Sequence, residues 1–119
     1  MTSATAVSQD EALNRLILDG AIMEALDRFY ADDVVMQENN DPPTKGKAAN
    51  LAREKAFVDS VQEFHGTTLH GQGSAGDVSY SEWTLDLTFK AGNRVQLHQV
   101  SARRWKDGQI VHERFYYKP

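Results

Sequence analysis

The chain has 119 residues, of which 40% are hydrophobic and 25% charged, and its formal net charge is -4. These values predict one globular domain over residues 1–119. The acidic balance and scattered basic residues argue against nucleic acid or an anionic membrane as a partner. The absence of cysteine excludes disulfides, cysteine-ligated metals and a thiol nucleophile. Neither a signal peptide nor a membrane span is recognisable, so the default expectation is a cytoplasmic protein.

The first part of the chain shows the periodicity of two helices. Ser8 and Glu11 have the spacing of a capping box, and apolar residues then recur at helical intervals until Gly20 offers a stop. A second, shorter amphipathic helix is predicted after a tight connection. Its apolar residues are Ile22, Ala25, Leu26 and Phe29.

A third helix is predicted after the loop "NNDPPTKGK". Asn50 and Glu54 lie four residues apart along the edge of its apolar stripe, where they either reach a pocket or point into water. The stripe itself consists of Leu51, Phe57, Val58 and Val61.

From residue 63 onward the pattern is that of β-strands. The segment "GQGSAGD" is predicted to be a glycine-rich turn region, and "SEWTLDLTF" then alternates strictly between apolar and polar residues. The turns "KAGN" and "KDGQ" separate two further strands. Helices followed by an antiparallel meander predict an α+β domain, with three N-terminal helices packed on one face of a curved, mostly antiparallel sheet.

The turn between the last two strands decides which residues share a face. We favour a three-residue turn with Gly108 in a left-handed bulge position. The facing pairs are then Trp105 with Gln109, Arg103 with Val111, Ser101 with Glu113, and Gln99 with Phe115. All odd-numbered residues from Leu97 to Tyr117 would share one face, whose mixture of polar and large apolar groups is typical of a pocket wall.

The alternative is a two-residue turn formed by Asp107 and Gly108. Every facing partner then shifts by one residue. The residues that would join the Glu113 face are His98, Val100, Ala102 and Arg104.

Several segments together resemble the SnoaL-like branch of the NTF2-like superfamily, which has a cystatin-like α+β fold. They are the junction "FYADDVVMQEN", the helix start "GKAA" and the terminal hairpin "RRWKDGQIVHERFYY". The resemblance covers essentially the whole chain. It implies a cone-shaped cavity between helices and sheet, frequent homodimers, and relatives that include ketosteroid isomerases, cyclases, epoxide hydrolases and non-catalytic binding modules.

The resemblance also suggests which residue could act as a base. Ketosteroid isomerases carry a carboxylate base shortly after this junction, and Glu38 is the matching position. Those enzymes hold the oxyanion between a tyrosine on the first helix and an aspartic acid on the strand before the last. The matching positions here are the segment "LNRLI" and Ser101, which contain neither residue. Both donors are therefore missing or replaced, for example by Ser101 or Gln99. Two acids around an arginine, as in epoxide hydrolases, could be formed by Glu38, Arg103 and Glu113.

Each candidate also has a purely structural interpretation. Glu38 is either a solvated strand end or a cavity acid, and Glu113 is either a second catalytic acid or the ion-pair partner of Arg103. Asn50 and Glu54 more often belong to a solvated helix edge. The residues proposed to line the ligand site are Trp83, Gln99, Ser101, Arg103, Phe115, Tyr117, Asn50 and Glu54.

A metal site is not expected. His65 and His70, five residues apart in a strand, should point to opposite faces, and His98 and His112 are not facing partners in either register. The resulting hypothesis is a homodimeric protein that binds a small organic molecule in an apolar pocket. The reaction would be proton abstraction next to a carbonyl, or hydration, without a cofactor; the alternative is a non-catalytic binding or dimerisation module.

Overall fold

The structure, a computed structural model, describes the backbone of residues 3–118 and the side chains of residues 8–118. Its three helices precede most of its six strands, and the strands form one sheet, which confirms the α+β class. The helices are α1 (Ser3–Leu18), α2 (Ile22–Phe29) and α3 (Lys47–Ser60). The strands are β1 (Tyr30–Glu38), β2 (Thr44–Lys45), β3 (Val61–Ala75), β4 (Val78–Phe89), β5 (Arg94–Lys106) and β6 (Gln109–Tyr117).

Helix α1 begins earlier than its sequence predicts. It starts at Ser3, so Ser8 and Glu11 lie inside the helix and form no capping box at its start. The segment before Ser8 contains two alanines and no glycine or proline, and nothing in it opposes helix formation. The C-terminal end agrees with the prediction, because Gly20 has φ of 82° and Ala21 donates its N–H to the carbonyl of Leu16.

The sheet has the strand order β2-β1-β6-β5-β4-β3. Neighbours from β3 to β6 are antiparallel, whereas β1 pairs with β6 in parallel. The loop after β1 contains a short strand of its own, since Thr44–Lys45 pairs with β1. The glycine-rich segment expected to be a turn is mostly strand, because β3 continues to Ala75 and only Gly76 and Asp77 turn the chain.

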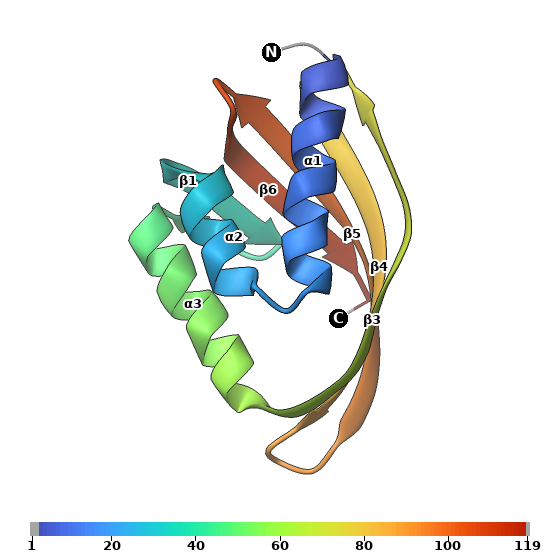
Figure 1. Cartoon of the computed structure of the whole chain (residues 1–119). Helices are drawn as coiled ribbons and strands as arrows, with labels where there is room; N and C mark the ends of the chain where they lie inside the picture. Colours follow the sequence, from blue (N-terminus) through green and yellow to red (C-terminus); the bar gives the residue numbers. More distant parts are fainter. Residues whose placement is uncertain (1–2, 119) are drawn as a thin grey trace.

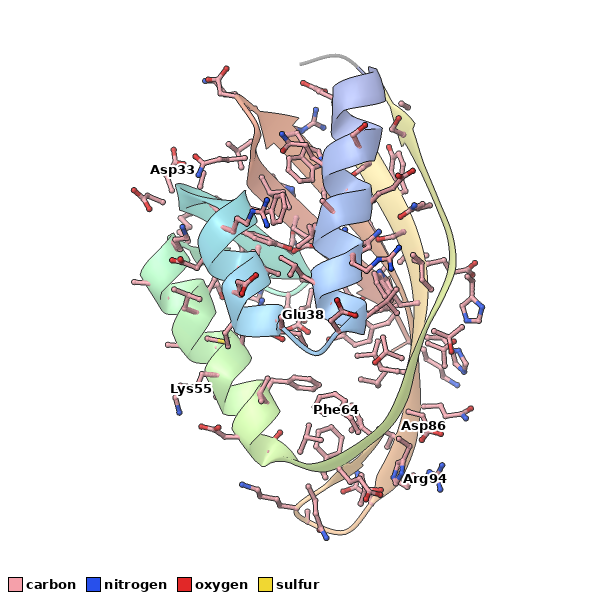
Figure 2. All side chains as sticks on the ribbon, in the orientation of Figure 1. Asp33, Glu38, Lys55, Phe64, Asp86 and Arg94 are labelled. Carbon is pink, nitrogen blue, oxygen red and sulfur yellow. The ribbon has the colours of Figure 1, made fainter. Side chains whose placement is uncertain are left out.

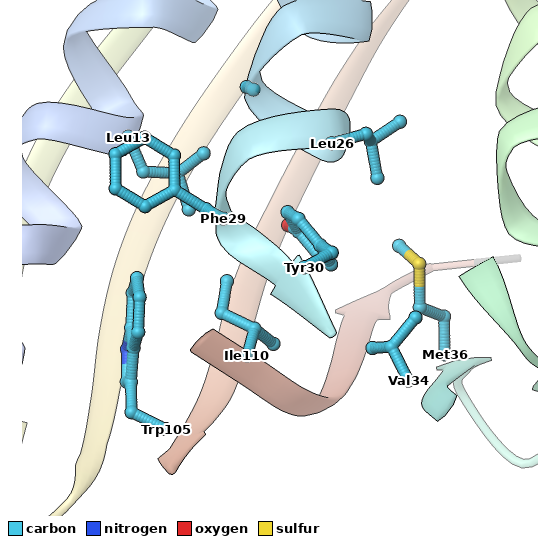
Figure 3. Packing of buried hydrophobic residues seen from close by; sticks show 9 residues of the cluster. Leu13, Leu26, Phe29, Tyr30, Val34, Met36, Trp105 and Ile110 are labelled. Carbon is cyan, nitrogen blue, oxygen red and sulfur yellow. The ribbon is translucent and has the colours of Figure 1, made fainter. Parts of the chain in front are cut away.

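All three helices lie on one side of the curved sheet (Figure 1). The closely packed core occupies one end of this layer, between α1, α2 and the strands β1, β5 and β6. There Phe29 contacts Trp105 edge to face with 6.2 Å between ring centroids, and Ile110 belongs to the same cluster and lies beside Trp105 (Figure 3). The candidate site adjoins this core, because five residues of the core cluster also line it: Leu13, Ala25, Leu26, Tyr30 and Met36.

The last hairpin combines features of both expected registers. Asp107 and Gly108 both have positive φ, 53° and 81°, so the turn has two residues. Val111 is an extra residue, because Ile110 faces Trp105 while His112 already faces Arg104. All four facing pairs predicted between β5 and β6, including that of Ser101 with Glu113, were therefore wrong.

The bulge at Val111 restores the predicted odd face from Glu113 onward, whereas before the bulge Ile110, and not Gln109 or Val111, shares the face of Trp105. Arg103 faces Glu113, and Ser101 faces Phe115. A two-residue turn without a bulge would have brought the even residues of β5 onto the Glu113 face. The correct face was thus predicted from an incorrect turn.

Bulges also place the histidines differently from the prediction. The register of β3 against β4 shifts at His65 and again at His70, so each histidine is an extra residue. His65 contacts Thr88 and His70 contacts Thr84, which lie on the same, polar face of β4. The expectation of opposite faces was wrong. Within the described residues, no three His, Asp or Glu side chains gather in a geometry that could hold a metal ion.

Candidate functional site

A cavity of about 390 Å³ opens between the helices and the sheet. Its walls are mostly apolar, and helices α1, α2 and α3 cover it from one side while β1 and β3 to β6 form the other. This volume lies at the lower end of the range of small-molecule sites, roughly 300–1,000 Å³. The cavity is large enough for a small organic ligand.

Most residues proposed from the sequence line this cavity. Nine of the ten do so: Glu38, Glu54, Trp83, Gln99, Ser101, Arg103, Glu113, Phe115 and Tyr117. Asn50 instead points away, because its side-chain amide donates to the backbone carbonyls of Thr44 and Gly46 at the start of α3. Asn50 is buried and fixes the loop before α3, so it has a structural role.

Glu38 is located at the end of β1, between the helical layer and the sheet (Figure 2). Its side chain is 39% exposed and also lines the cavity, so the two interpretations of the sequence are both partly correct. One carboxylate oxygen accepts a hydrogen bond from Arg53 at 3.0 Å, and the other accepts one from the Tyr117 hydroxyl at 2.8 Å. These two donors hold the carboxylate at the mouth of the cavity.

Tyr117 places a phenol directly beside this carboxylate. Burial and the hydrogen bond to the Glu38 carboxylate raise the pKa of Tyr117 to about 12. The hydroxyl therefore stays protonated at neutral pH and remains a hydrogen-bond donor. A carboxylate and a phenol donor thus stand side by side on the cavity wall.

Glu54 projects from α3 into the cavity, and among the described residues no side chain or backbone group donates a hydrogen bond to it. Burial raises the pKa of the Glu54 carboxyl. The neighbouring Arg53 lowers it, and the carboxylates of Glu113 and Glu38 raise it again. Glu54 is consequently an acid in an apolar cavity without a partner from the protein.

This environment predicts that Glu54 destabilises the folded protein at neutral pH. Because the pKa of Glu54 is raised in the folded state, the folded protein binds more protons than the unfolded chain at pH values between the ordinary glutamate pKa and the folded pKa. The free energy of unfolding therefore falls as the pH rises through this range. Glu54→Gln should therefore be more stable than the wild type at neutral pH, with the difference disappearing in acid. Urea denaturation of both proteins at neutral and at acid pH measures this difference in the free energy of unfolding.

The matched control is Glu24→Gln, which removes the same charge from an exposed position on α2. Its stability should follow the pH dependence of the wild type. An equal pH response of the two variants would contradict the proposed environment of Glu54.

The deep end of the site is closed by a buried network around Arg103. Its Nε donates to Glu113 at 2.7 Å, and its Nη1 donates to Asp10 and to Asn14, both at 2.7 Å. Burial lowers the pKa of Arg103, but the negative charges of Glu113 and Asp10 outweigh it and leave the pKa raised. Arg103 is therefore a permanent cation, and it lies between two carboxylates.

Glu113 has both oxygens engaged in this network. One accepts from Arg103, the other accepts from the Tyr30 hydroxyl at 2.5 Å, and the residue is 0% exposed. Burial, followed by the charge of Glu113, raises the pKa of Tyr30 well above its usual range, which keeps the phenol protonated. The expected ion pair of Arg103 and Glu113 is confirmed, and it leaves Glu113 little opportunity to act on a ligand.

Sequence reasoning missed several residues of this site. Arg53, the cation beside Glu38, was not considered, and neither were Asp10 and Asn14. The signal for the last two was available, because Asp10, Leu13, Asn14 and Ile17 have the spacing of one helix face. Two polar residues within an otherwise apolar stripe indicate a buried polar partner, here Arg103.

The sequence as a whole matches one family model, described as the SnoaL-like domain, over residues 5–117. The chain belongs to the SnoaL-like domain family. No curated protein matches it in sequence. Of the helices in the described part of this SnoaL-like chain, none combines the length and apolar character that a membrane span requires.

Solved structures similar to this SnoaL-like protein carry different activity names. One, from Mesorhizobium loti, is classed as a SnoaL-like polyketide cyclase; it is 29% identical, with 93% of this chain and 97% of that chain covered and a TM-score of 0.82. An LEH-like epoxide hydrolase from M. tuberculosis is 21% identical, with 98% and 84% covered and a TM-score of 0.78. AclR from Streptomyces galilaeus, classed as a hydroxylase, is 14% identical, with 98% and 91% covered and a TM-score of 0.80.

These similarities establish the fold and the family but no reaction. Three activity names occur on one architecture, so the chemistry of this SnoaL-like domain has to be inferred from the side chains in its own cavity.

Proposed function

We propose that this SnoaL-like protein binds a small, largely apolar molecule containing a carbonyl group and removes a proton from the carbon next to it. The observation that carries the proposal is the pair formed by Glu38 and Tyr117 on the wall of the apolar cavity, 2.8 Å apart. A carboxylate can accept the proton, and a neutral phenol can stabilise the enolate oxygen.

The two residues would act in sequence. When a ligand carbonyl enters, the Tyr117 hydroxyl turns from Glu38 to the carbonyl oxygen, which frees a lone pair on the Glu38 carboxylate. Glu38 then accepts the α-proton while the electrons of the broken C–H bond form the enolate, and it returns the proton to the same or another carbon. Arg53 holds the second oxygen of Glu38 throughout. Tyr117 thus takes the place of the oxyanion donors that the sequence lacks.

The primary test is exchange of the α-protons of an enolisable ketone such as benzylacetone in deuterated water, followed by NMR, together with ligand-induced thermal stabilisation. We expect protein-dependent exchange and a rise in Tm. Tyr117→Phe should slow exchange by about 10²-fold, the usual effect of losing one oxyanion donor. Unchanged exchange in Tyr117→Phe would contradict its role.

A second candidate is a non-catalytic binding module. It is favoured by one observation, namely that both oxygens of Glu38 already accept hydrogen bonds from the protein. The same experiment separates the two functions, because a binding module would be stabilised by the ketone without exchanging its α-protons.

A further inference from the structure

The charged groups of the cavity do not balance. Among the charged side chains that line it, Arg53 pairs with Glu38 and Arg103 pairs with Glu113, whereas Glu54 has no counter-ion. Behind the wall, Asp10 adds a second carboxylate to Arg103 at 2.7 Å. Two guanidinium groups therefore face four carboxylates, which makes the interior of the cavity electronegative.

The walls around this charge are aromatic as well as aliphatic. Four aromatic residues contribute from α3, β4 and β6: Phe57, Trp83, Phe115 and Tyr117. Aromatic rings attract cations through their quadrupoles, by about 0.5–2 kcal/mol depending on desolvation. An anionic ligand would be repelled by the unbalanced carboxylates, and a neutral ligand would leave Glu54 buried without a partner.

We propose that the ligand of this cavity carries a protonated amine on an apolar body and that Glu54 binds the ammonium group. The assignment of Glu54 rests on the proposed function only in treating the cavity as the ligand site, whereas the ketone part of the ligand rests on the proposed chemistry of Glu38 and Tyr117. Glu38 and Tyr117 stay available for a carbonyl elsewhere in the same molecule, so the substrate class becomes an apolar amino ketone.

Charged and titratable groups reach Glu54 from several sides. Arg53 adjoins it on α3, Glu38 and Tyr30 approach from β1, and Arg103 and Glu113 lie on β5 and β6. Burial, and after it the carboxylates of Glu113 and Glu38, raise the pKa of Glu54 and so favour its protonated form, whereas a bound cation would favour the ionised form. Binding of a permanent cation should therefore strengthen as pH rises through the Glu54 titration.

The test compares three probes of similar size and different charge: phenethylamine, phenethyl alcohol and phenylacetate. Dissociation constants from calorimetry should favour the amine over the alcohol by about tenfold, and phenylacetate should bind most weakly. Phenethyltrimethylammonium, whose charge does not titrate, should bind more tightly as pH rises. Glu54→Gln should abolish the preference for the amine and the pH dependence of ammonium binding, and it should still bind the alcohol. Glu24→Gln should change neither the preference nor the pH dependence.

Each result has a definite meaning. Equal binding of amine and alcohol, or an amine preference that survives in a folded Glu54→Gln variant, overturns the assignment of Glu54 but leaves the cavity as a ligand site. Failure of the amine to bind also overturns it. If the alcohol and benzylacetone fail to bind as well, the proposed function is contradicted along with the inference.

Discussion

Glu38→Gln is expected to slow the exchange of α-protons from a bound ketone by roughly 10²–10⁴-fold, the usual contribution of a positioned general base. Glutamine keeps the size of the side chain and can still accept one of the two hydrogen bonds, from Tyr117 or from Arg53, through its single carbonyl oxygen, but it cannot accept the substrate proton. NMR-detected exchange in deuterated water, at saturating benzylacetone, measures the effect directly.

Two comparisons make this result interpretable. Ketone binding to Glu38→Gln, measured by the rise in Tm, should stay within a few-fold of the wild type, so that the loss lies in the chemical step. Glu24→Gln, with the same charge removed from an exposed site on α2, should exchange at the wild-type rate. Wild-type exchange in Glu38→Gln would exclude Glu38 as the base.

The second large effect concerns stability rather than activity. Arg103→Met should lower the free energy of unfolding by about 3–5 kcal/mol, because it leaves the buried carboxylates of Asp10 and Glu113 without their cation. A domain of this size has a total of about 6–18 kcal/mol, so the loss is a large fraction of it. Urea denaturation at neutral pH provides the measurement.

The chain offers a matched control on its surface. Arg94 binds the carboxylate of Asp86 through two nitrogens, Nε and Nη2, and this pair lies on the outer side of the sheet, where the Arg94 side chain is 61% exposed (Figure 2). Arg94→Met should leave stability nearly unchanged, since exposed ion pairs contribute little. If both substitutions have the same effect, burial of the Arg103 network is not what makes it important.

The helices and the strand faces could be predicted because they depend on local periodicity. The strict alternation around Trp83 and Leu87 identified a buried face, and both residues are buried. The register could not be predicted in the same way. Bulges at Val111, His65 and His70 are set by pairing with distant strands, and nothing in the immediate sequence distinguishes an extra residue from a paired one.

The residues that line the site could be predicted from the sequence, but their hydrogen-bond and ion-pair partners could be predicted only in part. Glu38 was found through a resemblance, and Glu113 through its strand face. That Glu113 is neutralised by Arg103 and Tyr30, whereas Glu54 has no partner, depends on which helix lies over which strand. Such contacts between residues far apart in the chain leave no periodic signal in one sequence.

The bulge at Val111 determines which residues of β6 form the pocket wall. If Val111 were instead paired within a regular ladder, the remainder of β6 would shift by one position against β5 and its two faces would be inverted. The side chains of Glu113, Phe115 and Tyr117 would then leave the interior together, and those of His112, Arg114 and Tyr116 would enter it. Deleting Val111 would leave the same residues facing each other, so the pocket wall should tolerate it, whereas a one-residue deletion or insertion between His112 and Tyr117 would invert the part of β6 beyond it.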